Sequence, residues 1–174
     1  LKCGKGSAYE GGIREPMIVR WPGTVQPGTR CNDYLIIEDF YPSILEMAGI
    51  DDYDVPQEID GISFVPLLKQ TKNHSQGRSL YWNCPNIWGE KGPGIGPSCT
   101  IRKDNWKMIY FYETGEKELY DIPNDTEENN NVAALYPQII NKLSKELGKF
   151  LRQTNGQRPS LKKTGKPCPW PDEI

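Results

Sequence analysis

Residues 99–112, CTIRKDNWKMIYFY, contain two runs of strand-forming residues on either side of a tight turn. Residues 99–102 and 106–112 are rich in β-branched and aromatic side chains and follow a period of two. The segment between them is Lys103-Asp104-Asn105, whose short polar residues favour chain reversal. This stretch predicts an antiparallel β-hairpin.

Two further strands and one helix extend this hairpin. Residues 78–82, RSLYW, precede it, and residues 118–122, ELYDI, follow a turn at Thr114-Gly115. Pro137 suits the first turn of a helix, and Asn155-Gly156 suits its end. The apolar stripe of this helix consists of Ile139, Ile140, Leu143, Leu147, Phe150 and Leu151. The predicted fold is α+β, a four-stranded antiparallel sheet with a packed C-terminal helix.

The first part of the chain carries one strand and one helix, too little to bury a core. Met17-Ile18-Val19 lies between Glu15-Pro16 and the turn Trp21-Pro22-Gly23, which predicts a short buried strand. Asp39 suits the N-cap of a helix that Gly49 ends. Its expected apolar face consists of Phe40, Ile44, Leu45, Met47 and Ala48. A lone strand needs a sheet to join, so this strand and helix are expected to belong to a larger α/β domain.

Three parts follow from this pattern. Residues 1–77 are predicted to be the C-terminal end of a larger α/β domain, and residues 78–155 a small antiparallel-sheet subdomain. Residues 156–174 hold four prolines and three lysines, and are expected to form an extended tail. The chain does not begin with Met, and we expect it to be the later part of a longer protein.

Charge and composition disfavour several classes of function. Lys and Arg number 21 against 23 for Asp and Glu, so the net charge is −2 and general binding to nucleic acid is not expected. No apolar run approaches the roughly 18 residues that a membrane helix needs. With a single histidine, His74, and no C-x-x-C pair, a zinc site is not expected either. His74 lies in a polar linker and is expected to have no functional role.

The five cysteines leave at least one thiol unpaired or paired outside the chain. Cys84 and Cys99 bracket a loop, each beside the end of a predicted strand. This placement predicts that their Cα atoms lie within the roughly 7 Å that a disulfide allows.

Lys5 stands between Gly4 and Gly6 near the start of the chain. Glycines let the backbone approach a ligand closely, and an ammonium with three donors suits a tetrahedral oxyanion. The plain alternative is a solvated lysine in a surface turn. A nucleotide-binding P-loop fits poorly, because Gly6 and not Ser or Thr follows the lysine and no strand precedes it.

The segment LKCGKGSAYEGGIREP, residues 1–16, resembles almost residue for residue a signature of the type I sulfatases, the arylsulfatase family of the alkaline phosphatase-like superfamily. Later segments resemble that family in the same order. They are Trp21-Pro22-Gly23, EDFYPSIL at 38–45, DGISFVPLL at 60–68, TIRKDNWKMI at 100–109 and ELYD at 118–121. The resemblance covers residues 1 to about 152.

The resemblance implies that Lys5 contacts the sulfate group of a substrate and stabilises its negative charge. Glu10 and Arg14 match the same signature and are expected to brace the loop by an ion pair or by backbone hydrogen bonds rather than touch substrate. Gly11 and Gly12 are expected to serve backbone geometry. The implied substrate is a sulfated small molecule or glycan, and family habit implies an exported, periplasmic or extracellular protein.

The resemblance also implies groups that these residues do not supply. The nucleophile of the family is a formylglycine made from a cysteine or serine in a Cys-x-Pro-x-Arg context, which none of the five cysteines matches. The calcium ligands of the family lie before the signature. We therefore expect calcium and formylglycine in the full-length parent, no metal ligand in this chain, and no activity of this chain alone.

The loop from Asn83 to Ser98 is the second place to seek substrate contacts, since the resemblance implies that it borders the pocket. Asn83, Asn86 and Trp88 are candidate substrate-binding residues, because amides can form hydrogen bonds with hydroxyls and a tryptophan face can stack on a sugar. The loop also holds Glu90 and Lys91, and an ordinary surface loop is the alternative. Trp82 and Trp106 are expected to be core or half-buried sheet residues rather than ligand platforms.

Two other functions compete with sulfate ester hydrolysis. One is a phosphodiesterase or phosphonate hydrolase of the same superfamily, which a different nucleophile upstream would reveal. The other is a carbohydrate-binding or interaction module formed by residues 78–155 alone, for which Lys5 would be dispensable. Neither the particular sulfate ester nor the oligomeric state follows from the residues.

Overall fold

The computed structural model describes residues 1–50, 52–70, 77–87, 89 and 92–174. The described chain forms two compact units, one of Leu1–Glu15 with Ser79–Ile174 and the other of Pro16–Arg78. Residues 1–15 therefore pack with the sheet. That residues 1–77 end a larger α/β domain stays a prediction.

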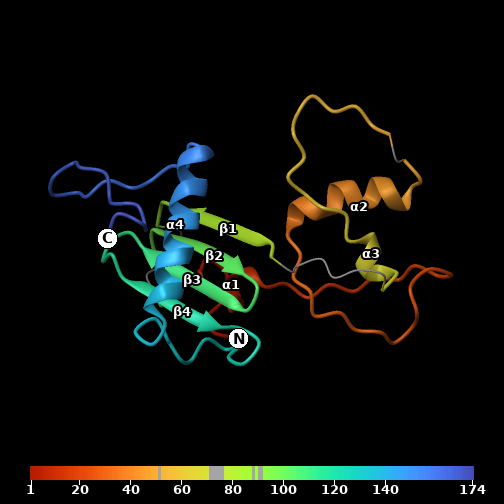
Figure 1. Ribbon diagram of the computed structural model, residues 1–174, viewed down its shortest axis with the longest axis horizontal. Helices are drawn as coiled ribbons and strands as arrows, with labels where there is room; N and C mark the ends of the chain where they lie inside the picture. The colour runs from red at the N-terminus through yellow and green to blue at the C-terminus, as the bar shows by residue number, and fades with distance from the viewer. Residues whose placement is uncertain (51, 71–76, 88, 90–91) are drawn as a thin grey trace. The chain divides into compact units, whose positions relative to one another are not determined.

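The first unit is built on a four-stranded antiparallel sheet in the order β1-β2-β3-β4 (Figure 1). The strands are β1 Ser79–Cys84, β2 Ser98–Lys103, β3 Trp106–Phe111 and β4 Lys117–Asp121. Lys103 pairs with Trp106 across the β2–β3 turn, where Asp104 takes a positive φ of 50°. Such a φ is tolerated by short polar side chains, which is why this sequence turns here. The predicted sheet and hairpin are confirmed.

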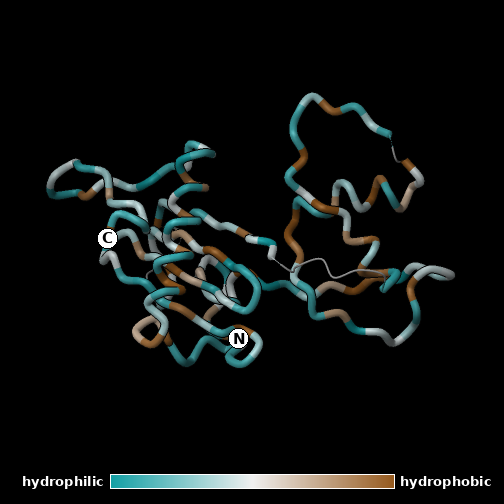
Figure 2. Tube along the Cα trace, in the orientation of Figure 1, coloured by the Kyte–Doolittle hydropathy of each residue, from teal (hydrophilic) through white to brown (hydrophobic). Residues whose placement is uncertain are grey.

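One face of the sheet is covered by helix α4, Pro137–Gln153, as predicted (Figure 1). Leu143, Leu147 and Leu151 recur at four-residue spacing and are buried against Ile101, Met108 and other core residues. Figure 2 shows apolar segments running through the strands beneath this helix. Each buried leucine contributes roughly 1.5–3 kcal/mol, so this stripe fixes the helix on the sheet.

The opposite face of the sheet is covered by the N-terminal residues. Because side chains alternate along a strand, Ile109 and Tyr120 point away from α4 and pack with Tyr9. Helix α1, Glu10–Ile13, lies in this N-terminal layer. The sheet therefore separates α4 from the loop that carries Lys5.

The last residues do not form a detached tail. They contain no long helix or strand, yet Cys168 and Trp170 are buried in the same core as α4. The Arg158 guanidinium lies 4.7 Å from the Trp170 ring centroid and donates a hydrogen bond to the Cys168 carbonyl. Apolar anchors near the chain end, which the proline- and lysine-rich composition conceals, hold this segment on the first unit.

The second unit holds a 3₁₀ helix, η1 Ile37–Asp39, and helices α2 Phe40–Met47 and α3 Val65–Leu68. The predicted helix after Asp39 is confirmed, but its expected apolar face is not buried: Pro42 and Ser43 are buried, whereas Ile44 is 57% exposed. The strand predicted at Met17-Ile18-Val19 was wrong for this chain. These residues lie outside any strand and Ile18 is 95% exposed, because no strand among the described residues pairs with them.

Asp39 links the separate parts of the second unit. It is fully buried, and its carboxylate accepts hydrogen bonds at 2.7 and 2.6 Å from the Arg78 guanidinium. The backbone N–H groups of Ile36 and Ile62 donate to the same carboxylate. Burial alone would raise the pKa of Asp39, but these hydrogen bonds outweigh burial and hold the pKa below its usual value.

Among the described residues, no helix combines the length and the apolar character needed to cross a lipid bilayer.

Candidate functional site

The N-terminal loop, residues 2–12, is a tight backbone arrangement that presents Lys5. The Gly11 N–H donates to the Lys2 carbonyl at 3.1 Å, and the Gly12 N–H donates to the Tyr9 carbonyl at 2.8 Å. A Cβ at Gly12 would lie 2.1 Å from the Ser7 carbonyl oxygen. Only glycine allows this approach, so the sequence places glycines here for packing.

A buried charge cluster ties the N-terminal loop to the sheet. The Lys107 side chain on β3 is fully buried, and its Nζ lies 3.0 Å from Glu10 Oε1 and 2.8 Å from Glu128 Oε1. The Glu10 backbone N–H donates to the Glu128 carboxylate at 2.5 Å. Burial raises the pKa of Glu128, while the Lys107 ammonium opposes that rise. Buried charges of this kind require all their partners, so the cluster holds the loop in one position.

Two arginines stand near the same carboxylate. Arg14 Nη1 and Arg102 Nη1 each lie 3.7 Å from Glu10 Oε2. Arg14 is the fourth residue after Glu10 on the chain, whereas Arg102 comes from β2. Glu10 thus joins α1 to two strands of the sheet.

An aromatic clamp fixes the start of the N-terminal loop. The Lys2 ammonium lies 4.0 Å from the Tyr9 ring centroid and donates to the Glu128 carbonyl at 3.0 Å. The hydroxyls of Tyr9 and Tyr120 both donate to Glu118 Oε2 at 2.8 Å. Burial, with Glu118 adding to it, raises the pKa of both tyrosines, so they stay protonated and keep donating.

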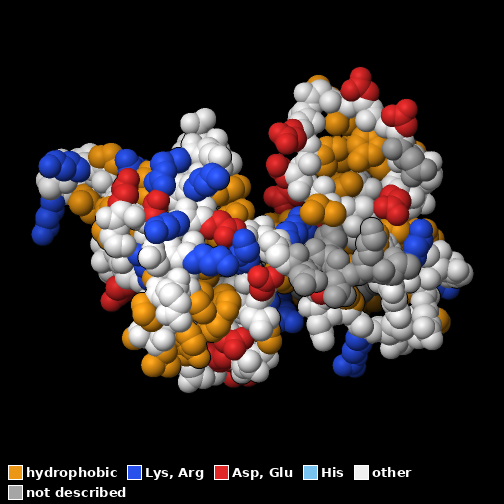
Figure 3. Space-filling view, in the orientation of Figure 1, with side chains coloured by type: hydrophobic (Ala, Val, Ile, Leu, Met, Phe, Trp, Pro, Cys, Tyr) orange, Lys and Arg blue, Asp and Glu red, His pale blue; other side chains and the backbone are white. Residues whose placement is uncertain are grey.

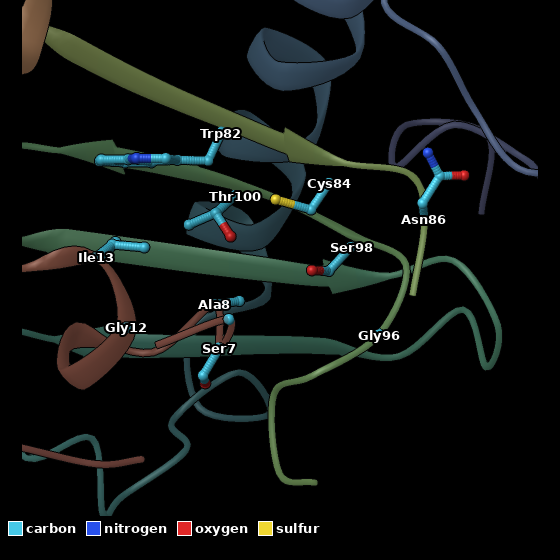
Figure 4. Close-up of a pocket in the computed structure, with 11 residues that line it drawn as sticks. Ser7, Ala8, Gly12, Ile13, Trp82, Cys84, Asn86, Gly96, Ser98 and Thr100 are labelled. Atoms are coloured by element: carbon cyan, nitrogen blue, oxygen red, sulfur yellow. The ribbon is translucent and has the colours of Figure 1, made fainter. Parts of the chain in front are cut away.

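A cavity of about 170 Å³ lies between the N-terminal loop and the sheet (Figure 4). The Ala8 N–H donates to the Gly94 carbonyl at 2.9 Å, which joins this loop to the segment before β2. The cavity is lined by Gly6, Ser7, Ala8, Gly12, Ile13, Trp82, Cys84, Asn86, Gly96, Ser98 and Thr100. Figure 4 shows Trp82, Cys84 and Thr100 projecting from the sheet on this side. An aromatic wall with a few hydroxyl and amide groups suits a polar ring-shaped ligand.

The family model described as N-sulphoglucosamine sulphohydrolase, C-terminal, matches residues 4–154. This chain belongs to that sulfatase family. The match begins at the loop that carries Lys5 and ends one residue after α4. The resemblance to sulfatases is thereby confirmed.

Individual sulfatases show the same relationship. "Sulfatase" of Formosa agariphila is 28% identical over 184 residues, covering 98% of this chain and 33% of the relative. Arylsulfatase K of Homo sapiens is 30% identical over 148 residues, covering 82% of this chain and 26% of the relative. The chain thus spans about a quarter to a third of the length of the curated sulfatases it matches.

A solved structure shares the fold of this chain. The crystal structure of Ps i-CgsB is 28% identical with a TM-score of 0.71, and the match covers 86% of this chain and 31% of that chain. Ps i-CgsB has also been solved in complex with k-i-k-neocarrahexaose. Most of this chain therefore has the same fold as about a third of Ps i-CgsB.

The structure brings some of the predicted site residues to the cavity. Lys5 is exposed on the N-terminal loop, directly before the lining residues Gly6 and Ser7. Asn86 lines the cavity from the loop after β1. Glu10 and Arg14 form the expected ion pair beneath this loop. That these residues serve a sulfate site stays a prediction.

Other predicted residues lie elsewhere. Asn83 projects from the α4 face of β1, where its amide donates to the Gln157 carbonyl at 2.7 Å and accepts from the Tyr112 hydroxyl at 3.0 Å. Both of its polar ends are used in the fold, on the opposite face from the cavity. Trp88, Glu90, Lys91 and His74 lie outside the described residues.

Trp82 is half-buried as expected, but it also lines the cavity. The sequence predicted that Trp82 is a sheet residue and not a ligand contact. The strand register shows that a sheet residue at this position can also line the cavity. Trp82 pairs with Thr100 and points away from α4, toward the N-terminal loop. Trp106 instead packs on the α4 side of the sheet.

No disulfide forms between Cys84 and Cys99, and all five cysteines are free thiols. The register pairs Cys99 with Asn83 and Cys84 with Ser98, so the two thiols point to opposite faces of the sheet. Cys99 lies in the core, where burial raises its pKa to about 12. That the two Cα atoms lie within roughly 7 Å stays a prediction, but this alternation separates the thiols and explains why no disulfide forms.

Lys107 and Glu128 were not found from the sequence. The signal for Lys107 was present: it is a charged residue at an inward position of the apolar run WKMIYFY, which demands buried partners. Glu128 gave no such signal, because it stands in the polar stretch Pro123 to Asn131. The pairing of Glu128 with Lys107 could not be inferred without the fold.

Within the part of the chain that the structure describes, no three His, Cys, Asp or Glu side chains come together in a group that could hold a metal ion.

Proposed function

We propose that this chain is the C-terminal part of a sulfatase that hydrolyses sulfate esters, and that Lys5 contacts the sulfate group. One observation carries this proposal: the loop that presents Lys5 borders the cavity and is fixed there by the buried Lys107–Glu10–Glu128 cluster. The family match over residues 4–154 supports the same reaction class. A charge held by rigid neighbours is what electrostatic catalysis requires.

Lys5 has an electrostatic role in this proposal. Cleavage of a sulfate ester moves negative charge onto the ester oxygen and spreads it over the sulfuryl oxygens. A fixed ammonium at hydrogen-bond distance stabilises that charge more in the transition state than in the substrate. Glu10 and Lys107 do not touch the substrate; they hold the backbone from which Lys5 extends.

Calcium and formylglycine are proposed for the full-length parent. The described residues of this chain offer no acidic cluster for a calcium ion, because no three His, Cys, Asp or Glu side chains come together among them. None of the five cysteines stands in a Cys-x-Pro-x-Arg context. We therefore assign no step through either group to these residues.

The proposed substrate is a sulfated glycan. Trp82 offers a ring face, while Asn86, Ser98 and Thr100 offer hydrogen-bonding groups on the same cavity wall. Trp and amide groups of this kind bind sugar rings and hydroxyls. Ps i-CgsB, of which this chain matches about a third (31%), has been solved with k-i-k-neocarrahexaose, which supports a glycan over a simple aryl sulfate. Export to the periplasm or outside the cell is proposed on family grounds alone.

The experiment that tests this function is Lys5→Ala in the full-length enzyme, assayed on a sulfate ester that the unmodified enzyme cleaves. Loss of one preorganised donor lowers kcat/KM by about 10²- to 10³-fold. Lys69→Ala, also at an exposed lysine, is the matched control and is expected to leave kcat/KM unchanged. If kcat/KM of the Lys5 variant stays within about twofold, Lys5 is not the sulfate contact.

A further inference from the structure

The outer side of α4 carries a row of basic side chains. Lys142, Lys145, Lys149 and Arg152 follow one another at spacings of three or four residues, so they share one helix face. At 1.5 Å per residue, the row is about 15 Å long. All four residues are exposed, and Figure 3 shows Lys and Arg side chains gathered over α4.

Acidic side chains do not neutralise the three lysines of this row. The one acid of α4 is Glu146, which turns toward the sheet and accepts from Lys103 Nζ at 2.8 Å on both oxygens. Burial alone would raise the pKa of Glu146, but hydrogen bonds from Lys103 and Ser79 hold it below its usual value. Arg152 pairs with Asp172. Within the described residues, no ion pair forms to the three lysines of the row.

The chain end adds more lysines beside this helix. Ser160 and Pro167 form an isolated β-bridge that closes a turn, and Leu161 N–H donates to the Lys166 carbonyl at 2.8 Å. The turn exposes Lys162, Lys163 and Lys166. Its base is held on the core by Cys168 and Trp170, which pack with α4.

The turn is also held directly to α4. Asp172 pairs with Arg152, and a Cβ at Gly148 would lie 2.0 Å from Asp172 Oδ1, so this contact depends on the glycine. Figure 3 shows basic side chains both on α4 and on the projecting turn in one view. We call the six lysines of these two elements the basic strip: Lys142, Lys145, Lys149, Lys162, Lys163 and Lys166.

This concentration of positive charge is local, since the whole chain has a net charge of −2. Like charges at spacings of three and four residues repel one another and weaken the helix. An anionic partner removes this repulsion and releases the counterions that the lysines otherwise hold. The basic strip therefore fits a polyanion better than it fits solvent alone.

We propose that the basic strip binds a sulfated polysaccharide, on the α4 side of the sheet and therefore opposite the cavity. This proposal rests on the proposed function in one respect, because it takes the sulfated glycan as the polyanion. Lysine ammonium groups attract sulfate half-esters as point charges without demanding one geometry. Several weak contacts along one polymer add up, so the strip would retain a chain whose sulfate esters are cleaved elsewhere.

The direct test measures binding of the 174-residue chain to fluorescently labelled dextran sulfate at low ionic strength. Two triple variants remove the same charge, one from the strip and one from exposed positions of the second unit. They are Lys142→Gln/Lys145→Gln/Lys149→Gln and Arg20→Gln/Arg30→Gln/Lys69→Gln. If each lost strip charge weakens binding by about twofold, the strip variant binds about eightfold more weakly. The control variant is expected to stay within about twofold.

Each outcome decides the proposal. Equal affinity of both triple variants for dextran sulfate overturns it, as does equal binding of neutral dextran by the unmodified chain. Unchanged melting temperatures of both variants show that folding does not explain a loss. Tighter binding of a single-stranded DNA than of dextran sulfate at the same salt concentration overturns the assignment to a glycan, whereas preference for dextran sulfate supports it.

Turnover by the full-length enzyme separates this proposal from the proposed function. The strip variant is expected to raise KM for a polymeric sulfated substrate and to leave kcat and the hydrolysis of a monosulfated sugar unchanged. An unchanged KM for the polymer overturns the proposal that the strip binds the polysaccharide, and it leaves the proposed sulfatase function intact. Absence of all sulfate ester hydrolysis contradicts the proposed function, and the dextran sulfate measurement then still decides whether the strip binds.

Discussion

The Lys107 ammonium lies 3.0 Å from the Glu10 carboxylate, although 97 positions separate the two residues in the sequence. Lys107 is on β3, and Glu10 begins the short helix beneath the loop that presents Lys5. Through this contact the sheet determines where Lys5 stands. The same ammonium serves Glu128, so one lysine compensates two buried carboxylates.

Lys107→Met is therefore expected to destabilise the chain by about 3–5 kcal/mol, because it leaves Glu10 and Glu128 buried without their cation. The free energy of unfolding is measured by urea titration. Lys145→Met, at an exposed lysine, should change it by less than about 0.5 kcal/mol. Adding Glu128→Gln to Lys107→Met should recover part of the loss, since it removes one uncompensated charge. A Lys107→Met chain as stable as the control would contradict this role.

The glycines of the N-terminal loop give a second prediction. Gly12→Ala places a Cβ against the Ser7 carbonyl, whereas a Cβ at Gly4 meets nothing within 4 Å. Gly12→Ala is expected to cost about 1–3 kcal/mol of stability, and Gly4→Ala less than about 0.5 kcal/mol. Melting curves of the two variants decide this. Equal melting temperatures would show that the loop can move aside without cost.

The local sequence pattern was enough to predict the sheet and α4, because the residues of each element repeat with the period of that element. The alternation in residues 99–112 and the stripe Leu143, Leu147 and Leu151 need only a partner surface, which the chain itself provides. The strand predicted at Met17-Ile18-Val19 failed for the opposite reason, since a strand depends on hydrogen bonds from a neighbour.

The candidate site was less accessible to sequence reasoning. Lys5 followed from a resemblance, but the cluster that holds its loop joins residues 10, 107 and 128, and no local pattern connects these positions. Strand register decided which side chains share a face, and one residue of register separates Asn83 from Trp82. Because of that alternation, Asn83 points away from the cavity and does not line it as the sequence suggested.

Leu143→Asp tests the packing of α4. Leu143 is 2% exposed in the core of the first unit, so the variant loses the transfer energy of a leucine and buries a carboxylate without a cation. A loss of about 4 kcal/mol or more is expected, enough to unfold this unit. Lys142→Asp changes the adjacent, exposed position and should leave the melting temperature nearly unchanged. An unaffected Leu143→Asp variant would show that this face does not pack on the sheet.

The Asp39–Arg78 pair makes the stability of the second unit depend on pH. The pKa of Asp39 is lowered by folding, so its contribution to stability is fully present above the unfolded-state pKa and is lost as the pH falls through the lower, folded-state pKa. Protection factors of the Ile36 and Ile62 amides, which donate to Asp39, should fall as the pH is taken from about 6 to about 3.

Asp39→Asn is expected to destabilise the second unit by about 3 kcal/mol even at neutral pH, because Arg78 then loses its anion in a site where its side chain is 12% exposed. It should also remove most of the acid dependence. Glu38→Gln, at the exposed neighbour, is the matched control and should preserve it. If protection in the unmodified chain is independent of pH over this range, the pair does not stabilise the unit.

The 174-residue chain alone is expected to give no sustained hydrolysis of a fluorogenic aryl sulfate with calcium present. Lys5 can polarise a sulfate, but an ammonium supplies no attacking atom, and no cysteine here stands in the sequence context that yields formylglycine. One donor is worth about 10²- to 10³-fold in rate within a complete site. On an exposed loop its field is screened by water and salt, so the same lysine contributes far less.

The comparison needs the full-length enzyme as the positive control and a Lys5→Ala version of the 174-residue chain as the background. Turnover by the short chain should equal that background, while the full-length enzyme turns over many times. Sustained, Lys5-dependent turnover by residues 1–174 would falsify the view that the attacking group comes from residues outside this chain. A nucleophile would then have to be sought among the groups that line the cavity, with Ser7, Cys84 and Ser98 as the first to replace.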